Sequence, residues 1–235
     1  MKKSSVNKIM AVARLNLSVQ NHYSPKEEYL IGITNKELHG DLVDITEENG
    51  NGVEKEKVIE KFDSFFKPEE MRCLALVAHN HMKPAMKIFV EQREELLKKF
   101  RLTGTNTTMT MLKNLFGDDK DVVYGPAFNS GPLGGDAEVC ALMCQENLGG
   151  VIFFMDPLDA HPHQADIDAL IRLSNVKNVL VVTNPTSAHA ACYVMKQALV
   201  EGRKDLIPSF FHSLESPGVK VYKENQAKEV AALKN

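Results

Sequence analysis

The chain has 235 residues, of which 43% are hydrophobic and 25% are charged. That length suits one large domain, or one domain with an extension. Its 28 basic and 31 acidic side chains give a net charge of -3, which excludes a general attraction to nucleic acid or to an anionic membrane. No apolar run approaches the roughly 18 residues that a membrane span needs. We therefore expect neither nucleic acid nor a membrane as a partner.

Residues 1–70 are predicted to be an N-terminal extension, partly ordered at most. Residues 1–26 contain lysines, an arginine and several serines but no acidic side chain. This bias is typical of organellar transit peptides, and it also fits a solvated basic tail. We expect a cytoplasmic protein and leave organellar targeting open. Short apolar pieces at 28–46 indicate a weak hairpin, and apolar residues at helical spacing predict a helix over 53–66 that Pro68 ends.

The four cysteines are Cys73, Cys140, Cys144 and Cys192. None belongs to a CxxC pair, and each lies in apolar sequence. We expect buried free thiols, which are typical of a reducing compartment.

From residue 73 onward the pattern alternates between strand and helix. A continuous apolar run predicts a buried parallel strand at 73–79, and 150–155 is the strongest buried strand. Further strands are predicted at 100–103, 122–125 and 179–184. Helices are predicted at 84–99, 106–116, 135–147, 163–174 and 187–200. This alternation predicts an α/β fold: a flavodoxin- or Rossmann-like parallel sheet with helices on both faces, forming a single main domain over 71–214. The tail covers residues 215–235. The alternating VKVYK at 219–223 favours an edge strand, and residues 224–235 favour a frayed helix.

Polar and ionisable residues follow the predicted strands, and in sheets of this kind ligands bind at the carboxyl ends of the strands. TGTNTT (103–108) resembles an oxyanion cradle, because Gly104 allows close approach, the side chains offer donors, and a helix begins there. The alternative is a threonine-rich helix cap. Lys83 is either a phosphate partner or a solvated lysine.

SGPLGGD (130–136) places three glycines before an acid. Asp136 is either a carboxylate held rigidly against a ligand or an N-cap of the next helix. Spacing alone does not separate these two interpretations.

DPLDAHPHQAD (156–166) concentrates aspartates and histidines. His163, Asp166 and Asp156 are predicted to form a hydrogen-bonded acid–base set. HxH patterns at 79–81 and 161–163 leave a metal site open, although zinc would need a third ligand and a second shell of hydrogen bonds.

LALVAHNHMK, TGTNTT, SGPLGGD, FFMDPLDAHPH and VVTN resemble, in order and spacing, the methylglyoxal synthase family over residues 70–214. The resemblance is specific because the chain combines GPLGGD with the DPL and PH residues of the later loop. The resemblance implies a flavodoxin-like homohexamer that converts dihydroxyacetone phosphate to methylglyoxal and phosphate. It implies no cofactor and no metal, and it makes phosphate an expected inhibitor.

The resemblance also implies roles for individual residues. Asp136 would be the catalytic base, with His163 and Asp166 in the catalytic set and with Asp156 and Asn80 in support. Substrate contacts would come from His79, Lys83, Thr103, Gly104, Thr105, Asn106, Ser130, Gly131 and His163.

Three positions depart from the family pattern. Asn80 stands where many members have Asp, Asn106 replaces a loop threonine, and His212 aligns with an arginine that approaches the phosphate. Asn80 and His212 favour an alternative, a non-catalytic regulatory domain that binds phosphorylated metabolites. The retained Asp136 and His163 favour the lyase.

Overall fold

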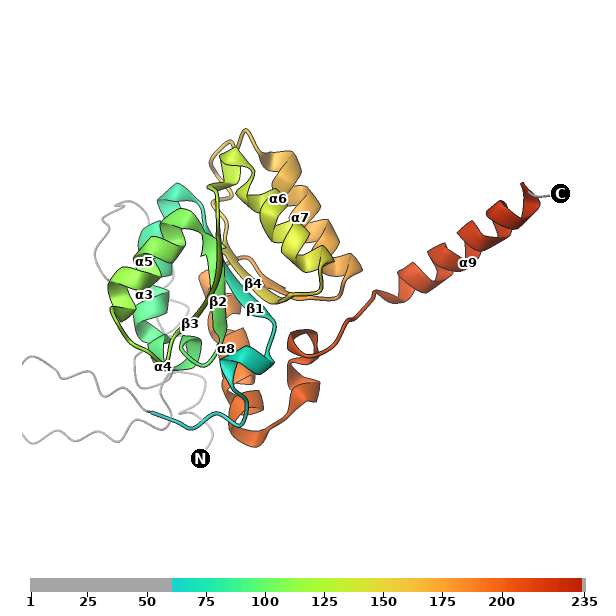
Figure 1. Cartoon of the computed structure of the whole chain (residues 1–235). Helices are drawn as coiled ribbons and strands as arrows, with labels where there is room; N and C mark the ends of the chain where they lie inside the picture. Colours follow the sequence, from blue (N-terminus) through green and yellow to red (C-terminus); the bar gives the residue numbers. More distant parts are fainter. Residues whose placement is uncertain (1–60, 234–235) are drawn as a thin grey trace, which may run out of the picture. The chain divides into compact units, whose positions relative to one another are not determined.

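The computed structural model describes residues 61–233, and these residues are built around one parallel sheet (Figure 1). The strand order is β3-β2-β1-β4-β5, and each neighbouring pair runs parallel. The predicted α/β fold is therefore confirmed. The strands are β1 (Cys73–Ala78), β2 (Arg101–Thr105), β3 (Val123–Phe128), β4 (Leu148–Phe154) and β5 (Leu180–Val182).

Helices cover both faces of the sheet. Core packing places α3, α4, α5 and α8 against one face and α6 and α7 against the other, an arrangement that can be followed in Figure 1. Among residues 61–233, no helix combines the length and the apolar character needed to cross a membrane. The helices are α3 (Lys83–Gln92), α4 (Glu94–Leu97), α5 (Asn106–Phe116), α6 (Gly135–Cys144), α7 (Gln164–Val176), α8 (Pro185–Glu201) and α9 (Pro217–Ala232), with short 3-10 turns at Pro68–Glu70, Asn80–Met82, Gly131–Leu133, Lys204–Leu206 and Pro208–Phe210.

Strand β1 is buried on both faces, which explains its unbroken apolar sequence. Leu74 and Leu76 belong to the core shared with α3 and α5, whereas Ala75 and Val77 belong to the core shared with α6 and α7. Because successive side chains of a strand alternate between faces, this one strand joins both layers.

The direction of winding reverses between β1 and β4. The chain moves outward from β1 to β2 and β3, then returns to place β4 on the other side of β1. The pair is in register from Leu74↔Gly150 to Ala78↔Phe154. The loops that leave the carboxyl ends of these two strands therefore diverge, and such a switch point is where sheets of this type bind ligands.

The structure differs from the predicted helices in two places. The predicted 84–99 helix is divided at Arg93, whose amide reaches the carbonyls of both Phe89 and Val90. The predicted 53–66 helix is wrong over 61–66, where the Ser64 hydroxyl accepts from the Phe66 amide in a turn and Phe66 enters the core. Residues 53–60 and the predicted hairpin at 28–46 lie outside the described residues.

The predicted edge strand at 219–223 is also wrong, because this segment begins α9. Pro217 occupies the first turn, where its missing amide proton costs nothing. Gln226 donates to the Tyr222 hydroxyl one turn away, at 3.0 Å. Helix-forming residues follow, so local propensity outweighs the alternation of Val and Lys.

The four cysteines are free thiols, as predicted, but they are not all buried. Cys73 and Cys192 are buried, whereas Cys144, the last residue of α6, is exposed. Burial raises the pKa of the Cys192 thiol to about 12 and, as the main cause, that of Cys140 to about 11. These two thiols therefore stay protonated and behave as small apolar side chains.

Candidate active site

A buried carboxylate and a histidine meet at the carboxyl edge of the sheet. Asp136 Oδ2 lies 2.7 Å from His163 Nδ1, and their side chains are only 1% and 9% exposed. Asp136 belongs to the first turn of α6, whereas His163 precedes α7. The N-cap of α6 is Gly134, and no side chain caps the helix. The interpretation of Asp136 as a helix cap is therefore wrong.

The second carboxylate oxygen of Asp136 is available for chemistry. Oδ1 is buried and has no hydrogen-bond partner among residues 61–233. Burial raises the pKa of Asp136, and the charge of Asp166 raises it further, while the hydrogen bond and charge of His163 act in the opposite direction. A carboxylate that burial makes more basic, with one oxygen fixed and one unpartnered, is suited to accept a proton.

The SGPLGG turn allows this close approach. The Ser130 carbonyl accepts from the amides of Leu133 and Gly135, which folds the chain back before α6. A Cβ on Gly131 would lie 2.7 Å from His163 Cε1 and 2.9 Å from Asp136 Oδ2. Only glycine therefore leaves room for the Asp136–His163 contact.

His79 offers a neutral donor beside this pair. Its Nδ1 accepts from the Asp156 amide at 2.9 Å, so the ring proton of the neutral form is on Nε2. That Nε2 is buried and unpartnered within the described part of the chain. Burial, followed by the neighbouring His161 and His163, lowers the pKa of His79 to about 4. The ring is therefore uncharged at neutral pH and can donate to an oxygen of a ligand.

Relatives of known name are similar to this chain in sequence. The chain is 36% identical over 143 residues to the methylglyoxal synthase of Yersinia enterocolitica (serotype O:8 / biotype 1B), a match covering 60% of this chain and 89% of that protein. The chain belongs to the methylglyoxal synthase family. It is also 39% identical over 115 residues to the methylglyoxal synthase of Yersinia pestis (strain Pestoides F), covering 49% of this chain and 71% of that protein.

One solved structure is also similar. It is the crystal structure of methylglyoxal synthase from Elizabethkingia anophelis NUHP1, with 35% identity, a TM-score of 0.44, and coverage of 54% of this chain and 78% of that one. No model of a known protein family matches the chain.

The TGTNTT segment runs from the end of β2 into the start of α5, as the sequence predicts. Gly104 has φ +158°, and a Cβ there would lie 2.2 Å from the Leu76 carbonyl oxygen, so β2 needs glycine at this point. The Thr103 hydroxyl donates to the Pro126 carbonyl. It is therefore already engaged, contrary to the prediction of a donor left for a ligand.

The end of the same segment opens α5. Thr105 is the N-cap residue, but its side chain makes no capping bond and instead lies 3.3 Å from the Thr108 hydroxyl. The cap interpretation is therefore wrong for this side chain. Exposed Asn106 is the first residue of α5. The amides and dipole of the helix start are the features that favour an anion here.

Lys83 begins α3 at the same edge of the sheet. Its Nζ donates to Asn80 Oδ1 at 2.8 Å. Because the amide is neutral, it orients the lysine without cancelling its charge. An Asp at position 80 would form an ion pair with Lys83, so Asn80 leaves more positive charge at this edge.

The predicted acid–base set of His163, Asp166 and Asp156 is not formed. His163 uses Nδ1 for Asp136, and within the described residues the Asp166 carboxylate makes no hydrogen bond to it. Asp156 turns instead toward His81 Nδ1 at 3.0 Å and accepts from the Leu158 amide. The Leu158 amide and then His81 lower the pKa of Asp156. Asp166 acts on Asp136 only through its charge.

His212 does not reach this edge of the sheet within its own chain. Its carbonyl accepts from Arg72, the residue before β1, at 2.7 Å. His212 therefore lies at the amino end of β1, opposite the site. Within a single chain His212 therefore does not face the site, and its effect on phosphate binding stays a prediction.

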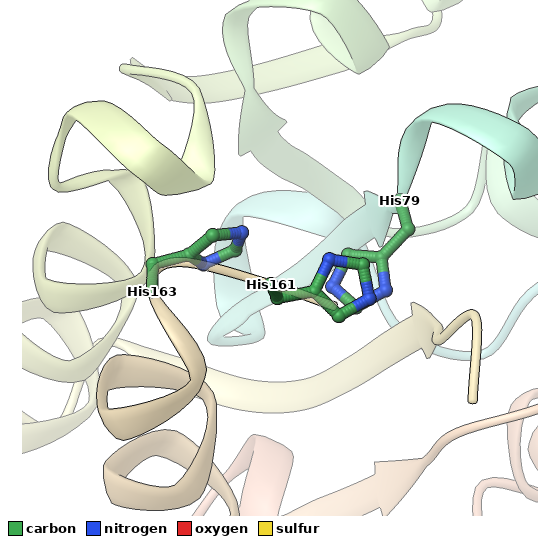
Figure 2. Close-up of side chains that lie close together, drawn as sticks. All are labelled: His79, His161 and His163. Atoms are coloured by element: carbon green, nitrogen blue, oxygen red, sulfur yellow. The ribbon is translucent and has the colours of Figure 1, made fainter. Parts of the chain in front are cut away.

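The sequence reading missed His161 as a member of the site. Figure 2 shows it beside His79, with ring centroids 3.6 Å apart. The available signal was the HPH pattern, which was interpreted only as a candidate metal motif. Spacing alone does not reveal that His79 follows a neighbouring strand and meets this loop.

Proposed function

We propose that this chain is a methylglyoxal synthase, a lyase that converts dihydroxyacetone phosphate to methylglyoxal and phosphate. The observation that carries the proposal is the buried Asp136, with Oδ2 fixed by His163 and Oδ1 unpartnered. Family membership supports a small phosphorylated substrate.

The first step is proton abstraction by Asp136. Oδ1 removes a proton from the carbon that bears the free hydroxyl, and the electron pair moves to the neighbouring carbonyl oxygen to give an enediolate. A free Asp, with a pKa of about 3.9, is a weak base. Burial of Asp136 raises its pKa and improves the match to this task.

The enediolate oxygens need hydrogen-bond donors. Neutral His79 donates from Nε2, and a His163 ring that carries both protons would donate from Nε2 while Nδ1–H holds Asp136. His79 carries no charge at neutral pH. It can therefore donate to the developing negative charge without the desolvation cost that a buried, charged imidazole would carry.

Phosphate then leaves. The hydroxyl on the deprotonated carbon loses its proton and becomes the aldehyde carbonyl, the carbon–carbon double bond shifts toward the carbon that carries phosphate, and the C–O bond to phosphate breaks. The resulting enol takes up a proton at that former phosphate-bearing carbon and so tautomerises to methylglyoxal. Lys83 and the start of α5 stabilise the departing dianion. A C–O(phosphate) bond held perpendicular to the enediolate plane favours this elimination over isomerisation.

Further expectations accompany the proposal. Free phosphate should compete with the substrate, the reaction needs no cofactor, and a homohexamer in the cytoplasm is expected from the family. Light scattering of the purified chain tests the oligomer.

The deciding experiment incubates purified full-length protein with dihydroxyacetone phosphate and follows methylglyoxal and phosphate together. Equal release of both products is expected. Well-folded protein that releases neither, yet binds inorganic phosphate, would instead establish the non-catalytic phosphometabolite-binding domain that Asn80 favours.

A further inference from the structure

Three imidazoles converge where the loops after β1 and β4 meet. One ring nitrogen from each of His79, His161 and His163 lies within 4.8 Å of the others. Figure 2 shows that His79 enters from one loop and the other two from the second. The proposed reaction uses His79 and His163 but gives His161 no role.

Two of these rings have the hydrogen bonds that metal-bound histidines have. His161 Nε2 lies 3.1 Å from the Asp156 carbonyl oxygen, which only accepts, so Nε2 carries the proton and Nδ1 keeps its lone pair. His163 Nδ1 lies 2.7 Å from the Asp136 carboxylate, which leaves Nε2 as the lone-pair nitrogen of the neutral ring. An imidazole that donates one N–H to a carbonyl or carboxylate is oriented to ligate through its other nitrogen.

The third ring is arranged differently. His79 accepts from the Asp156 amide at Nδ1, so its Nε2 holds a proton. In this state it cannot ligate a cation, but it can donate to a water or hydroxide bound to one. The protein therefore supplies two imidazole ligands, His161 and His163, and one hydrogen-bond donor, His79. Water molecules complete the coordination of the ion.

We propose that His161 and His163 bind a borderline transition-metal ion such as Zn²⁺, with His79 supporting its bound water, and that this ion inhibits the enzyme. Imidazole selects Zn²⁺, Co²⁺, Ni²⁺ and Cu²⁺ over Mg²⁺ and Ca²⁺, which prefer oxygen ligands. Two protein ligands make a reversible, exchangeable site rather than a structural one.

The ion should inhibit the reaction because it would lie at the proposed catalytic residues. Zn²⁺ on His163 Nε2 would take the nitrogen that donates to the enediolate and would stand beside the Asp136 base. This part of the inference rests on the proposed function, whereas ion binding does not.

A second cluster nearby provides a matched control. His81, Asp156 and Asp159 also bring possible ligand atoms within 4.8 Å of one another. However, His81 is 73% exposed and is already hydrogen-bonded to Asp156. Removing the His81 imidazole removes a surface histidine and leaves both proposed ligands in place.

The binding test titrates Zn²⁺ into chelator-treated full-length protein by calorimetry and repeats the titration with Co²⁺ while following its visible absorption. One ion per chain is expected. His161→Phe keeps an aromatic ring against His79 but removes both nitrogens, and it should weaken binding about 10-fold or more. His81→Gln should bind as the unaltered protein does.

Two results would overturn the site: no saturable binding of either ion, or loss of binding in His81→Gln with retention in His161→Phe. Mg²⁺ at millimolar concentration should not compete, and full competition by Mg²⁺ would contradict the imidazole ligands.

The inhibition test measures turnover of dihydroxyacetone phosphate with added Zn²⁺. Unaltered protein and His81→Gln should lose turnover and regain it with a chelator, whereas Zn²⁺ should remove a much smaller fraction of the turnover that His161→Phe shows without the ion. Stoichiometric Zn²⁺ binding without inhibition would overturn the inhibitory role. If ion-free protein shows no turnover at all, the proposed function fails, and the calorimetric result still decides the metal site.

Discussion

Two of the carboxylate–histidine pairs among residues 61–233 lie at the carboxyl edge of the sheet and differ in their surroundings. Asp136 and His163 are 2.7 Å apart with side chains almost fully buried, whereas Asp156 and His81 are 3.0 Å apart with His81 largely in solvent. The pKa of Asp136 is raised, chiefly by burial, and the pKa of Asp156 is lowered, chiefly by the Leu158 amide. The same two residue types therefore give the proposed proton acceptor in one place and a hydrogen-bonded loop contact in the other.

The largest expected effect separates the two carboxylates directly. Asp136→Asn removes the proposed base and should lower kcat by roughly 10²–10⁴-fold, the range typical of a general base. Asp156→Asn, at the pair whose histidine is exposed, should lower kcat by less than about 10-fold. Initial rates of methylglyoxal formation measure both. Equal loss in the two variants would remove the distinction between the pairs.

The next effect tests the room that the buried pair needs. Gly131→Ala would place a methyl group 2.7 Å from His163 Cε1 and force the pair apart. We expect a loss in kcat of about 100-fold, as for other displacements near 1 Å in an active site. Gly218→Ala, whose Cβ would approach only Ser216 Oγ at 3.9 Å, is the control and should leave kcat unchanged. Normal turnover in Gly131→Ala would show that the reaction does not depend on the 2.7 Å contact between Asp136 and His163.

A smaller effect concerns the charge of Asp166, which raises the pKa of Asp136 through space. Removing it in Asp166→Asn should move the acidic limb of the kcat/KM–pH profile to lower pH and change kcat at neutral pH by less than about 10-fold. If the acidic limb of the profile stays at the same pH while kcat falls far more than 10-fold, Asp166 takes part in the reaction directly and does not act only through its charge.

The smallest effect is on stability. Because the pKa of Asp136 is higher in the folded than in the unfolded chain, its ionisation destabilises the fold as pH rises from the unfolded towards the folded pKa. Asp136→Asn should therefore have a higher free energy of unfolding than the unaltered protein at pH 7, and the difference should shrink at pH 3. Urea denaturation at both pH values measures it. A less stable variant at pH 7 would mean that the carboxylate supports the fold.

The sequence predicted the sheet well because its signal is local. Continuous apolar runs mark β1 and β4, which are buried along their whole length, whereas the edge strands β3 and β5 are only partly buried. The polar residues that follow the strands mark the carboxyl edge. Helix and strand are harder to separate where patterns compete. VKVYK alternates like an edge strand, yet Pro217 and the helix formers after it determine the structure.

The site was only partly predictable because its contacts join distant residues. Asp136 and His163 are 27 positions apart, and no local pattern distinguishes a carboxylate facing a histidine from a helix cap. The HxH at 79–81 illustrates the same limit, since His79 turns inward to the Asp156 amide and His81 turns outward to its carboxylate. Two residues apart in sequence, they belong to different sites.

The register of β1 against β4 has a consequence for folding. Ala78 pairs with Phe154, and this alignment brings His79 to the Asp156 amide across 77 positions. Contacts so distant along the chain are slow to form. A refolding chain would therefore acquire its site late, when these two strands dock. Recovery of turnover should coincide with protection of the β1 amides from hydrogen exchange. The proposed activity would then report the time at which β1 and β4 pair during refolding.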